Sequence, residues 1–299
     1  MLSRVRAFFA ARGVMEVETP ALSQAATIDP NLASFTVPTA EGERYLHTSP
    51  EFPMKRLLAA GSGDIYQICK AFRADEMGRH HNPEFSLLEW YRVGYDHIAL
   101  MDEVEALLDE VFADARALGS IARFTYREAL MRYAGLDILT ATAETCRACA
   151  SAHGIEVRDE LGLQQWLELL MSHVVVPACA EGFTFIYDYP PEQAALARIR
   201  PGNPPLAERF ELLGYGLELA NGFHELADVQ EQRARFEREL RIQRERGLPT
   251  VPVDERLLAA LEHGLPDCSG VALGLDRLVM LAADVDDIAQ AMAFSWCGA

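Results

Sequence analysis

Long apolar runs are absent from this sequence of 299 residues. No stretch approaches the ~18 consecutive apolar residues that a membrane-spanning helix needs, and the richest one, 173–187, is interrupted by Pro177 and Glu181. We therefore expect no membrane association. No apolar segment near the start ends at a small-residue cleavage site, so we expect no secretion signal and a cytoplasmic protein.

Cysteines and basic residues are both scarce. Six cysteines are too few and too scattered for a disulfide framework, and the lone pair Cys146 and Cys149 lacks the second ligand pair of a zinc site. With 27 Lys and Arg against 45 Asp and Glu, the formal charge is −18. Because binding a long polyanion depends on neutralising its phosphates, we expect no stable binding of tRNA.

The order of the predicted elements indicates the fold class. Strand patterns occur at 65–72, at 85–95 and again after about residue 183, whereas about 124–180 is mostly helical. Strands and helices do not alternate as they do in βαβ units. We therefore predict an α+β fold in one domain, 1–299, with an antiparallel sheet flanked by helices and a helical insertion at about 124–180.

Helical patterns are recognised by their apolar spacing and their capping residues. In the region 228–246, Glu231 precedes Arg235 by four residues and Glu237 precedes Arg241 likewise, which is typical of a solvated helix. The expected helices lie at 1–12, 51–60, 102–118, 143–153, 161–174, 228–246, 254–262 and 276–283.

Two glutamates flank a predicted β-hairpin. If Gly214 and Tyr215 form a two-residue turn, Glu211 faces Glu218 across the strands. Residues opposite one another have Cβ atoms ~5 Å apart, so these carboxylates would repel without a cation between them. Because oxygen ligands suit Mg²⁺, the pair is a candidate metal site; the alternative is two exposed acids that point at water.

Two segments have residue types suited to a nucleotide. The polar loop between the first two strands begins at Arg73 and ends at Phe85. Arg73 could bind phosphate oxygens, and Phe85 could stack on a base. In 269–282, Gly274 permits a close backbone approach and Arg277 opens a helix, although no P-loop pattern is present. For the loop, solvated charges are the alternative interpretation.

Three motifs in order resemble motifs 1, 2 and 3 of the class II aminoacyl-tRNA synthetases. They are Thr19-Pro20, FRADEMGRHHNPEF at 72–85 and GLDR at 274–277. Further segments are similar to lysyl-tRNA synthetase: TSPE at 48–51, LLEWY at 87–91 and ELANGFHEL at 218–226.

Almost from end to end, the sequence resembles the elongation factor P lysine ligases, which are truncated paralogues of lysyl-tRNA synthetase. Motif 1 begins almost at Met1, so we expect no anticodon-binding domain. Ala272 stands where the synthetases usually have glycine, at the floor of the amino-acid pocket. Asp75 stands where motif 2 usually has glutamate, and the shorter side chain could weaken a contact to adenine.

The resemblance also implies roles for individual residues. Arg73 and Arg277 would be catalytic, because they meet the phosphates of ATP, and Glu211 and Glu218 would bind Mg²⁺. The nucleotide would contact Arg73, Asp75, His81, Asn82, Phe85, Glu218, Leu219, Gly274 and Arg277. The amino acid would contact Ser49, Glu51, Glu89, Tyr91, Asn221, Glu225 and Ala272.

The activity implied by the resemblance is that of an ATP-dependent, AMP-forming ligase. With Mg²⁺, it would activate (R)-β-lysine as an adenylate and transfer it to the ε-amino group of a lysine of elongation factor P. Motif 1 normally builds an interface, so a homodimer is expected. Two alternatives are a small synthetase-like enzyme that charges tRNA or another amine, and an inactive regulatory paralogue. The latter would usually have lost motif arginines or metal acids that are present here.

Overall fold

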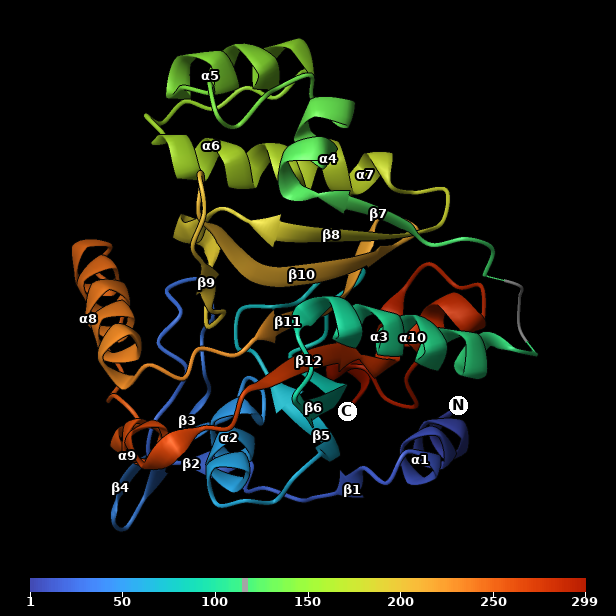
Figure 1. The fold of residues 1–299 in the computed structure, drawn as a ribbon, viewed down its shortest axis with the longest axis vertical. Helices are drawn as coiled ribbons and strands as arrows, with labels where there is room; N and C mark the ends of the chain where they lie inside the picture. Colours follow the sequence, from blue (N-terminus) through green and yellow to red (C-terminus); the bar gives the residue numbers. More distant parts are fainter. Residues whose placement is uncertain (115–117) are drawn as a thin grey trace. The chain divides into compact units, whose positions relative to one another are not determined.

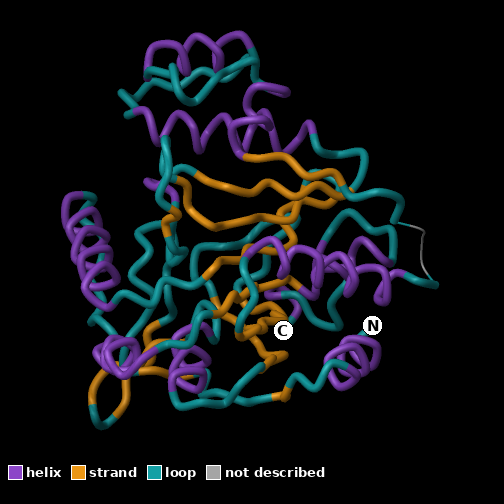
Figure 2. The backbone as a smooth tube through the Cα atoms, viewed as in Figure 1, coloured by secondary structure: helices purple, strands orange, loops and turns teal. Residues whose placement is uncertain are grey.

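Two compact units make up the chain in a computed structural model that describes residues 1–114 and 118–299. The first unit combines Met1–Ala117 with Glu225–Ala299, and the second unit is Leu118–His224. Figure 1 shows the elements of both units, and Figure 2 separates their helices, strands and loops by colour. The single domain expected over 1–299 stays a prediction.

An antiparallel sheet forms the centre of the first unit. β5 (Ile65–Phe72), β6 (Glu84–Val93) and β12 (Cys268–Gly274) lie side by side, and the short β1 (Met15–Glu16) runs parallel to β5. The two strands predicted on either side of the polar loop are thus confirmed as β5 and β6. Because successive side chains of a strand point to opposite faces, this sheet has two chemically different faces.

Aromatic side chains hold one face of this sheet against helix α1 (Leu2–Ala11). The ring of Phe9 stacks on Tyr66 with centroids 4.4 Å apart and meets the edge of Trp90 at 5.4 Å. All three rings are buried. Helix α10 (Leu275–Ala282) packs against β6.

Helix α3 differs from the predicted helix at 102–118. It begins at His97, because the Asp96 side chain accepts a hydrogen bond from the Ala99 N–H and caps the first turn. It ends at Phe112. Part of the predicted range, 115–117, lies outside the described residues.

Smaller elements surround this sheet. A second sheet has the order β2-β4-β3, and helix α2 packs against α9. The helices predicted at 51–60, 228–246 and 254–262 are confirmed. These elements are β2 (Leu22–Ser23), β3 (Thr36–Thr39), β4 (Gly42–Leu46), α2 (Glu51–Ala59), α8 (Val229–Glu245), α9 (Glu255–Gly264) and the 3₁₀ turns Ile288–Gln290 and Trp296–Gly298.

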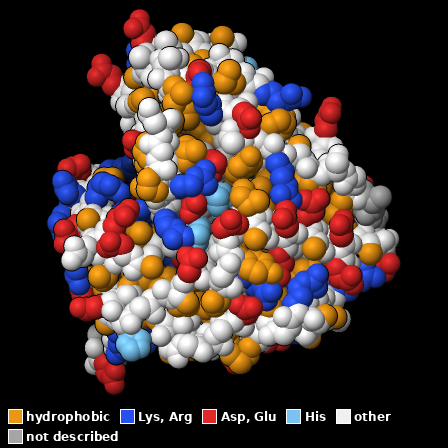
Figure 3. Space-filling view, in the orientation of Figure 1, with side chains coloured by type: hydrophobic (Ala, Val, Ile, Leu, Met, Phe, Trp, Pro, Cys, Tyr) orange, Lys and Arg blue, Asp and Glu red, His pale blue; other side chains and the backbone are white. Residues whose placement is uncertain are grey.

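Basic and acidic side chains are mixed over α8, at the left of Figure 3. Arg235 forms the predicted ion pair with Glu231, and Arg233 lies 2.8 Å from a carboxylate oxygen of Glu255 in α9. The other predicted pair, between Glu237 and Arg241, is not among the ion pairs of the described residues. The Arg235 side chain is only 7% exposed, so it is not solvated as predicted, whereas Arg233 and Glu255 form an ion pair at the surface.

The second unit is also built on a sheet. β8 (Phe183–Tyr189), β10 (Leu206–Gly214) and β11 (Leu217–His224) are antiparallel neighbours, β7 (Ala122–Thr125) runs parallel to β8, and β9 (Ile199–Arg200) pairs with β10. The helices expected at about 124–180 are present: α4 (Tyr126–Tyr133), α5 (Ala143–Ala152), α6 (Leu163–Leu170), a π-helical turn Met171–Val175, α7 (Val176–Ala178) and, later, a 3₁₀ turn Pro191–Gln193.

Helices and strands of this unit share one apolar core, which contains Trp166, Leu170 and Ile186. Cys146 of α5 is fully buried in it, so this cysteine serves helix packing as expected. Within the part of the chain that the structure describes, no helix has the length and hydropathy needed to cross a membrane.

The hairpin between β10 and β11 has a different turn from the predicted one. Its central residues are Tyr215 and Gly216, with φ of 52° and 78°, a left-handed pair typical of a type I′ turn. Gly214 is already paired with Leu217, and a Cβ on Gly214 would lie 2.5 Å from Leu219 Cδ1. Gly214 is therefore required by packing, and Gly216 by the turn.

The register of this hairpin contradicts the predicted pairing of two glutamates. The ladder shifts between Leu212 and Leu213, which places Glu211 opposite Asn221 and Glu218 opposite Leu213. The predicted pairing of Glu211 with Glu218 is therefore wrong. Strand alternation cannot be carried across this irregularity, so the register does not place the two glutamates on one face.

We predict that Gly216→Ala lowers the free energy of unfolding by about 1 kcal/mol, because an L-residue is strained in the left-handed conformation. The matched control is Gly182→Ala, where nothing lies within 4 Å of an added Cβ and φ is not in the left-handed region. Urea unfolding of both variants measures the difference. Equal stabilities of the two variants would contradict the assigned turn.

Candidate active site

The polar face of the first unit's sheet is acidic and deeply buried. Glu89 and Tyr91 alternate with Trp90 along β6 and therefore point away from the aromatic face. The Tyr91 hydroxyl donates a hydrogen bond of 2.7 Å to Glu89 Oε1. Glu89 Oε2 is buried and has no hydrogen-bond partner among the described residues, so one carboxylate oxygen remains available to a ligand.

Helix α2 adds a lysine to this acidic face. Lys55 Nζ donates to Glu51 Oε1 at 2.7 Å, one helical turn away, and lies 2.5 Å from Glu225 Oε2. The Lys55 side chain is 2% exposed. The Glu225 N–H donates to the Cys268 carbonyl at 2.9 Å, which fixes that residue beside β12. We call Glu51, Lys55, Glu89, Tyr91 and Glu225 the acidic cluster.

Burial and the repulsion between carboxylates raise the pKa of the two buried glutamates in this cluster. Burial raises the pKa of Glu89 well above its usual value, and the neighbouring Glu51 raises it further. Burial also raises the pKa of Glu225 to about 8, although Lys55 opposes this effect. Burial alone would lower the pKa of Lys55, but the carboxylates of Glu225 and Glu51 outweigh it, so its pKa is raised.

Two small residues of β12 complete the cluster. A Cβ on Gly270 would lie 2.2 Å from the Tyr91 ring and 2.7 Å from Glu225 Oε1, so only glycine fits there. Ala272 is directly opposite Glu89 in the ladder. Residues opposite one another share a face, so the register places the Ala272 methyl beside the cluster. Its role at the floor of an amino-acid pocket stays a prediction.

Arg73 lies at the neck of the motif 2 loop. Its backbone N–H donates to the Pro83 carbonyl at 2.8 Å, and its guanidinium carbon is 5.1 Å from the centroid of the Phe85 ring. Its partner is Glu76, at 3.2 Å, rather than Asp75 at the usual acid position of the motif. Arg73 Nε is buried without a hydrogen-bond partner among the described residues, so it can still donate to a phosphate oxygen.

Arg277 reaches the same loop from α10. Its Nε donates to the His80 carbonyl at 3.2 Å, and its Nη2 lies 2.7 Å from His81 Nε2. Burial and the positive charge of Arg277 lower the pKa of His81. Two of the predicted nucleotide residues, Arg277 and His81, are thus in contact.

Other contacts hold this loop and α10 in place. Asn82 Nδ2 donates to the Glu84 carbonyl at 2.6 Å, and Asn82 Oδ1 accepts from the Trp296 N–H at 2.9 Å. Gly274 precedes the first turn of α10 and pairs with Leu87 of β6. Asn82 and Gly274 are therefore fixed by contacts within the protein, and their nucleotide roles stay predictions.

The predicted metal residues lie in the second unit, beside an arginine that the sequence did not single out. Arg209 Nη2 donates to Glu211 Oε1 at 2.5 Å, its Nε donates to Asn221 Oδ1 at 3.3 Å, and its guanidinium carbon is 4.5 Å from the Tyr189 ring centroid. Although burial opposes it, the pKa of Arg209 is raised, first by Glu211 and further by Tyr189 and Glu218. Both glutamates therefore act on one cation.

Two predicted residues have surroundings that sequence patterns did not reveal. Leu219 is 2% exposed and packs beside Gly214, so its backbone rather than its side chain could meet a nucleotide. Ser49 lines a hollow of about 740 Å³ whose lining includes Phe52 and Arg56 of α2. The other predicted amino-acid residues do not line this hollow.

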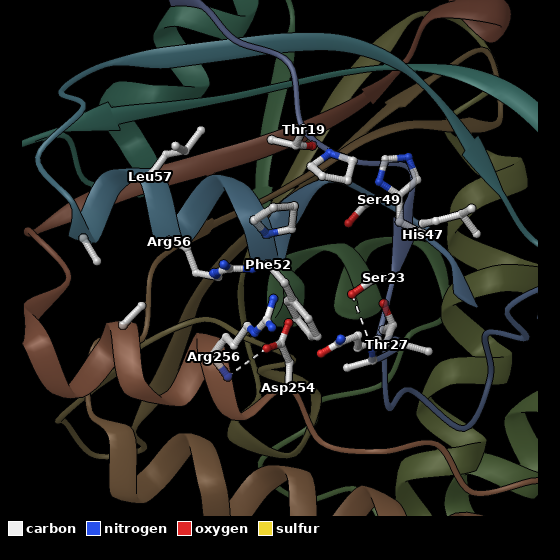
Figure 4. Close-up of a pocket in the computed structure, with 18 of the residues that line it drawn as sticks. Thr19, Ser23, Thr27, His47, Ser49, Phe52, Arg56, Leu57, Asp254 and Arg256 are labelled. Atoms are coloured by element: carbon white, nitrogen blue, oxygen red, sulfur yellow. Dashed lines mark hydrogen bonds between the residues drawn. The ribbon is translucent and has the colours of Figure 1, made fainter. Parts of the chain in front are cut away.

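Figure 4 shows that Arg56 and Arg256 point toward one another in this hollow, with Asp254 beside them. The Asp254 carboxylate caps α9 by accepting hydrogen bonds from the Arg256 and Leu257 N–H groups. Glu51 and Lys55, which lie on the same helix as Arg56, belong instead to the acidic cluster. The hollow and the acidic cluster are therefore different sites.

Sequence reasoning missed Lys55, Arg209 and Gly270. Lys55 could have been found from its spacing, because it follows Glu51 by four residues on a predicted helix. Gly270 and Arg209 gave no such signal, since their contacts come from strand register.

Comparison with known proteins gives a consistent result over nearly the whole chain. The family model of class II tRNA synthetases (D, K and N) matches residues 1–296. An elongation factor P–(R)-β-lysine ligase from Vibrio cholerae serotype O1 is 48% identical over 308 residues, which cover 98% of this chain and 92% of that protein.

Two further relatives carry the same name. The protein from Edwardsiella ictaluri is 47% identical over 309 residues, and that from Salmonella typhi is 48% identical over 309 residues. Each alignment covers 99% of this chain and 92% of the relative. The chain belongs to the class II tRNA synthetase (D, K and N) family and, within it, to the group of the elongation factor P–(R)-β-lysine ligases.

Proposed function

We propose that this protein is an ATP-dependent ligase that activates (R)-β-lysine and transfers it to the ε-amino group of a lysine of elongation factor P. The observation that carries the proposal is the acidic cluster, where the buried Glu89 and Glu225 and the half-buried Glu51 are accompanied by a single lysine, which pairs with Glu51 and Glu225. A buried site with excess carboxylates suits a substrate with two ammonium groups. The names of the relatives support the same substrate and the same acceptor.

In the first step, the substrate carboxylate attacks the α-phosphorus of ATP, and pyrophosphate leaves. The negative charge that develops on the phosphate oxygens needs preorganised donors. Arg73 and Arg277 are proposed for this role, and the buried Arg73 Nε has an unused hydrogen. Phe85, 5.1 Å from the Arg73 guanidinium, is proposed to stack on adenine.

Glu211 and Glu218 are proposed to hold Mg²⁺. The donor set fits this ion, because both residues offer carboxylate oxygens from the two strands of one hairpin. The contact of Glu211 with Arg209 keeps a cation at this carboxylate. When bound, Mg²⁺ would neutralise charge on the phosphates of ATP.

In the second step, the uncharged ε-amino group of the acceptor lysine attacks the adenylate carbonyl carbon. The carbon–nitrogen bond forms, the bond to phosphate breaks and AMP leaves, while the proton of the amine passes to solvent. The adenylate is already activated, so positioning can supply much of the acceleration. A chain with a formal charge of −18 is poorly suited to bind the polyanion tRNA, which agrees with a protein amine as the acceptor.

We further propose a cytoplasmic homodimer. Three apolar side chains around motif 1 are well exposed: Leu2 at 45%, Met15 at 49% and Leu22 at 44%. A second copy of the chain that covered these side chains would remove their apolar surface from water. Cytoplasmic location follows from the proposed acceptor, a translation factor.

The proposed function predicts two results with the purified protein. ATP–pyrophosphate exchange should be faster with (R)-β-lysine than with L-lysine or (S)-β-lysine, and incubation with ATP should add one lysyl mass to elongation factor P. Exchange kinetics and intact mass spectrometry measure these results. Charging of tRNA without a protein adduct would instead support the synthetase-like alternative, and no exchange with any amino acid would support the inactive paralogue.

The position of Ala272 opposite Glu89 predicts a role in selectivity. Removing one methyl from a pocket is worth about 1 to 3 kcal/mol of discrimination, so Ala272→Gly should raise activation of L-lysine relative to (R)-β-lysine by roughly ten-fold. Exchange kinetics with both amino acids measure the ratio. Ala283→Gly, at the C-cap of α10, is the matched control. If the ratio is the same in both variants, Ala272 does not discriminate.

A further inference from the structure

The acidic cluster contains one cation that is not part of any substrate. Lys55 Nζ lies 2.7 Å from Glu51 Oε1 and 2.5 Å from Glu225 Oε2, and its side chain is 2% exposed. A buried ammonium between two carboxylates is held there by charge, because neither partner can be removed without leaving an uncompensated ion. Lys55 is therefore a fixed part of the site.

The number of charges around Lys55 can be counted. The ionisable groups of the described residues that face one another here are Glu51 and Lys55 from α2, Glu89 and Tyr91 from β6, Cys69 from β5 and Glu225. Burial raises the pKa of Tyr91 well above its usual value and that of the Cys69 thiol to about 12, so both stay neutral. Three carboxylates and one ammonium remain, with a charge of −2 when all are ionised.

We propose that Lys55 is a built-in counter-ion of the amino-acid pocket: when the three carboxylates of the acidic cluster are ionised, Lys55 cancels one of their negative charges and leaves two, the number of ammonium groups on a diamino acid. This inference rests on the proposed function. Lys55 is a positioning residue here, since it acts through Glu51 and Glu225. The unpartnered Glu89 Oε2 is the oxygen still open to a substrate ammonium.

Two other roles for Lys55 are less consistent with the site. A nucleophilic lysine must lose its proton, but the two carboxylates raise the pKa of Lys55 and keep it charged. A lysine that merely occupied the substrate position would compete with the substrate, so its removal would tighten binding. The counter-ion role requires the opposite effect on binding near neutral pH.

The proposal predicts how the pocket exchanges protons. Lys55 lowers the pKa of both Glu89 and Glu225, so these values should rise further in Lys55→Met. A carboxyl whose pKa is raised in the folded state contributes stability that is lost as pH rises toward that pKa. In the native protein, the stability that Glu225 contributes should fall with rising pH until Glu225 is ionised, near pH 8. In Lys55→Met this fall should continue above that pH.

The experiment measures the thermal unfolding temperature of the full chain between about pH 6 and pH 9 without substrate. Lys55→Met should show the extended loss of stability at alkaline pH, whereas Lys55→Arg, which keeps the charge, should follow the native profile. Met54→Leu, a neighbouring buried position of α2, is the control for packing. Profiles of Lys55→Met and the native protein that coincide would overturn the proposal.

A compensating variant covers the case in which Lys55→Met does not fold. In Lys55→Met combined with Glu51→Gln, Glu89 and Glu225 are the only groups of the acidic cluster that can carry a charge near neutral pH, so the charge with both ionised returns to −2. This double variant should fold and regain most of the native pH profile. If the double variant is no more stable than Lys55→Met, Lys55 does not act by neutralising a carboxylate, and the proposal is wrong.

Exchange kinetics test the link to substrate. Near neutral pH, the KM of Lys55→Met for (R)-β-lysine should be roughly ten-fold above the native value and should approach it as pH rises, because the carboxyls then ionise. A lower KM at every pH would overturn the proposal. If the native protein does not activate (R)-β-lysine, the proposed function fails, and the unfolding profiles still decide the charge of the pocket.

Discussion

A carboxylate is stable inside a protein only when a cation or a hydrogen-bond donor accompanies it. The first unit buries Glu89 and Glu225 on one face of its sheet and provides Lys55, the Tyr91 hydroxyl and backbone N–H groups as partners. These partners do not satisfy every oxygen, since Glu89 Oε2 has none. The carboxylate oxygens that lack a partner can therefore bind the ammonium groups of a substrate.

The opposite face of the same sheet makes this burial possible. Phe9, Tyr66 and Trp90 form an apolar contact that ties α1 to the strands, and apolar burial of this kind is the main stabilising term in folding. Strand alternation then places Glu89 and Tyr91 on the other side without further adjustment. Apolar packing on one face of the sheet thus offsets the unfavourable burial of charge on the other face.

Much of this arrangement could be predicted from the sequence. The paired strands on either side of the polar loop, the helices of the second unit and the glutamate of α2 follow from local patterns and from the resemblance to known motifs. The hairpin register could not, because it depends on which glycine is left-handed. Gly214 and Gly216 look alike in the sequence, but only Gly216 has a positive φ, and the shift at Leu212 moves Glu218 away from Glu211.

The partners of buried charges were equally hidden from the sequence. Arg209 and Lys55 look like ordinary basic residues of a strand and a helix, and their importance comes from contacts between distant segments. Glu225 is 170 positions after Lys55, yet their charged atoms lie 2.5 Å apart. Such pairs are fixed by the fold as a whole, so local patterns cannot reveal them.

The central claim is that the acidic cluster recognises two ammonium groups at once. Calorimetric titration of the native protein with (R)-β-lysine, 3-aminohexanoic acid and 6-aminohexanoic acid tests it most directly, because each analogue lacks one amine. Truncating one partner of a buried charge pair typically costs about 2 to 5 kcal/mol, so each analogue should bind roughly 30-fold more weakly or worse. Binding of either analogue with the affinity of (R)-β-lysine would contradict the account.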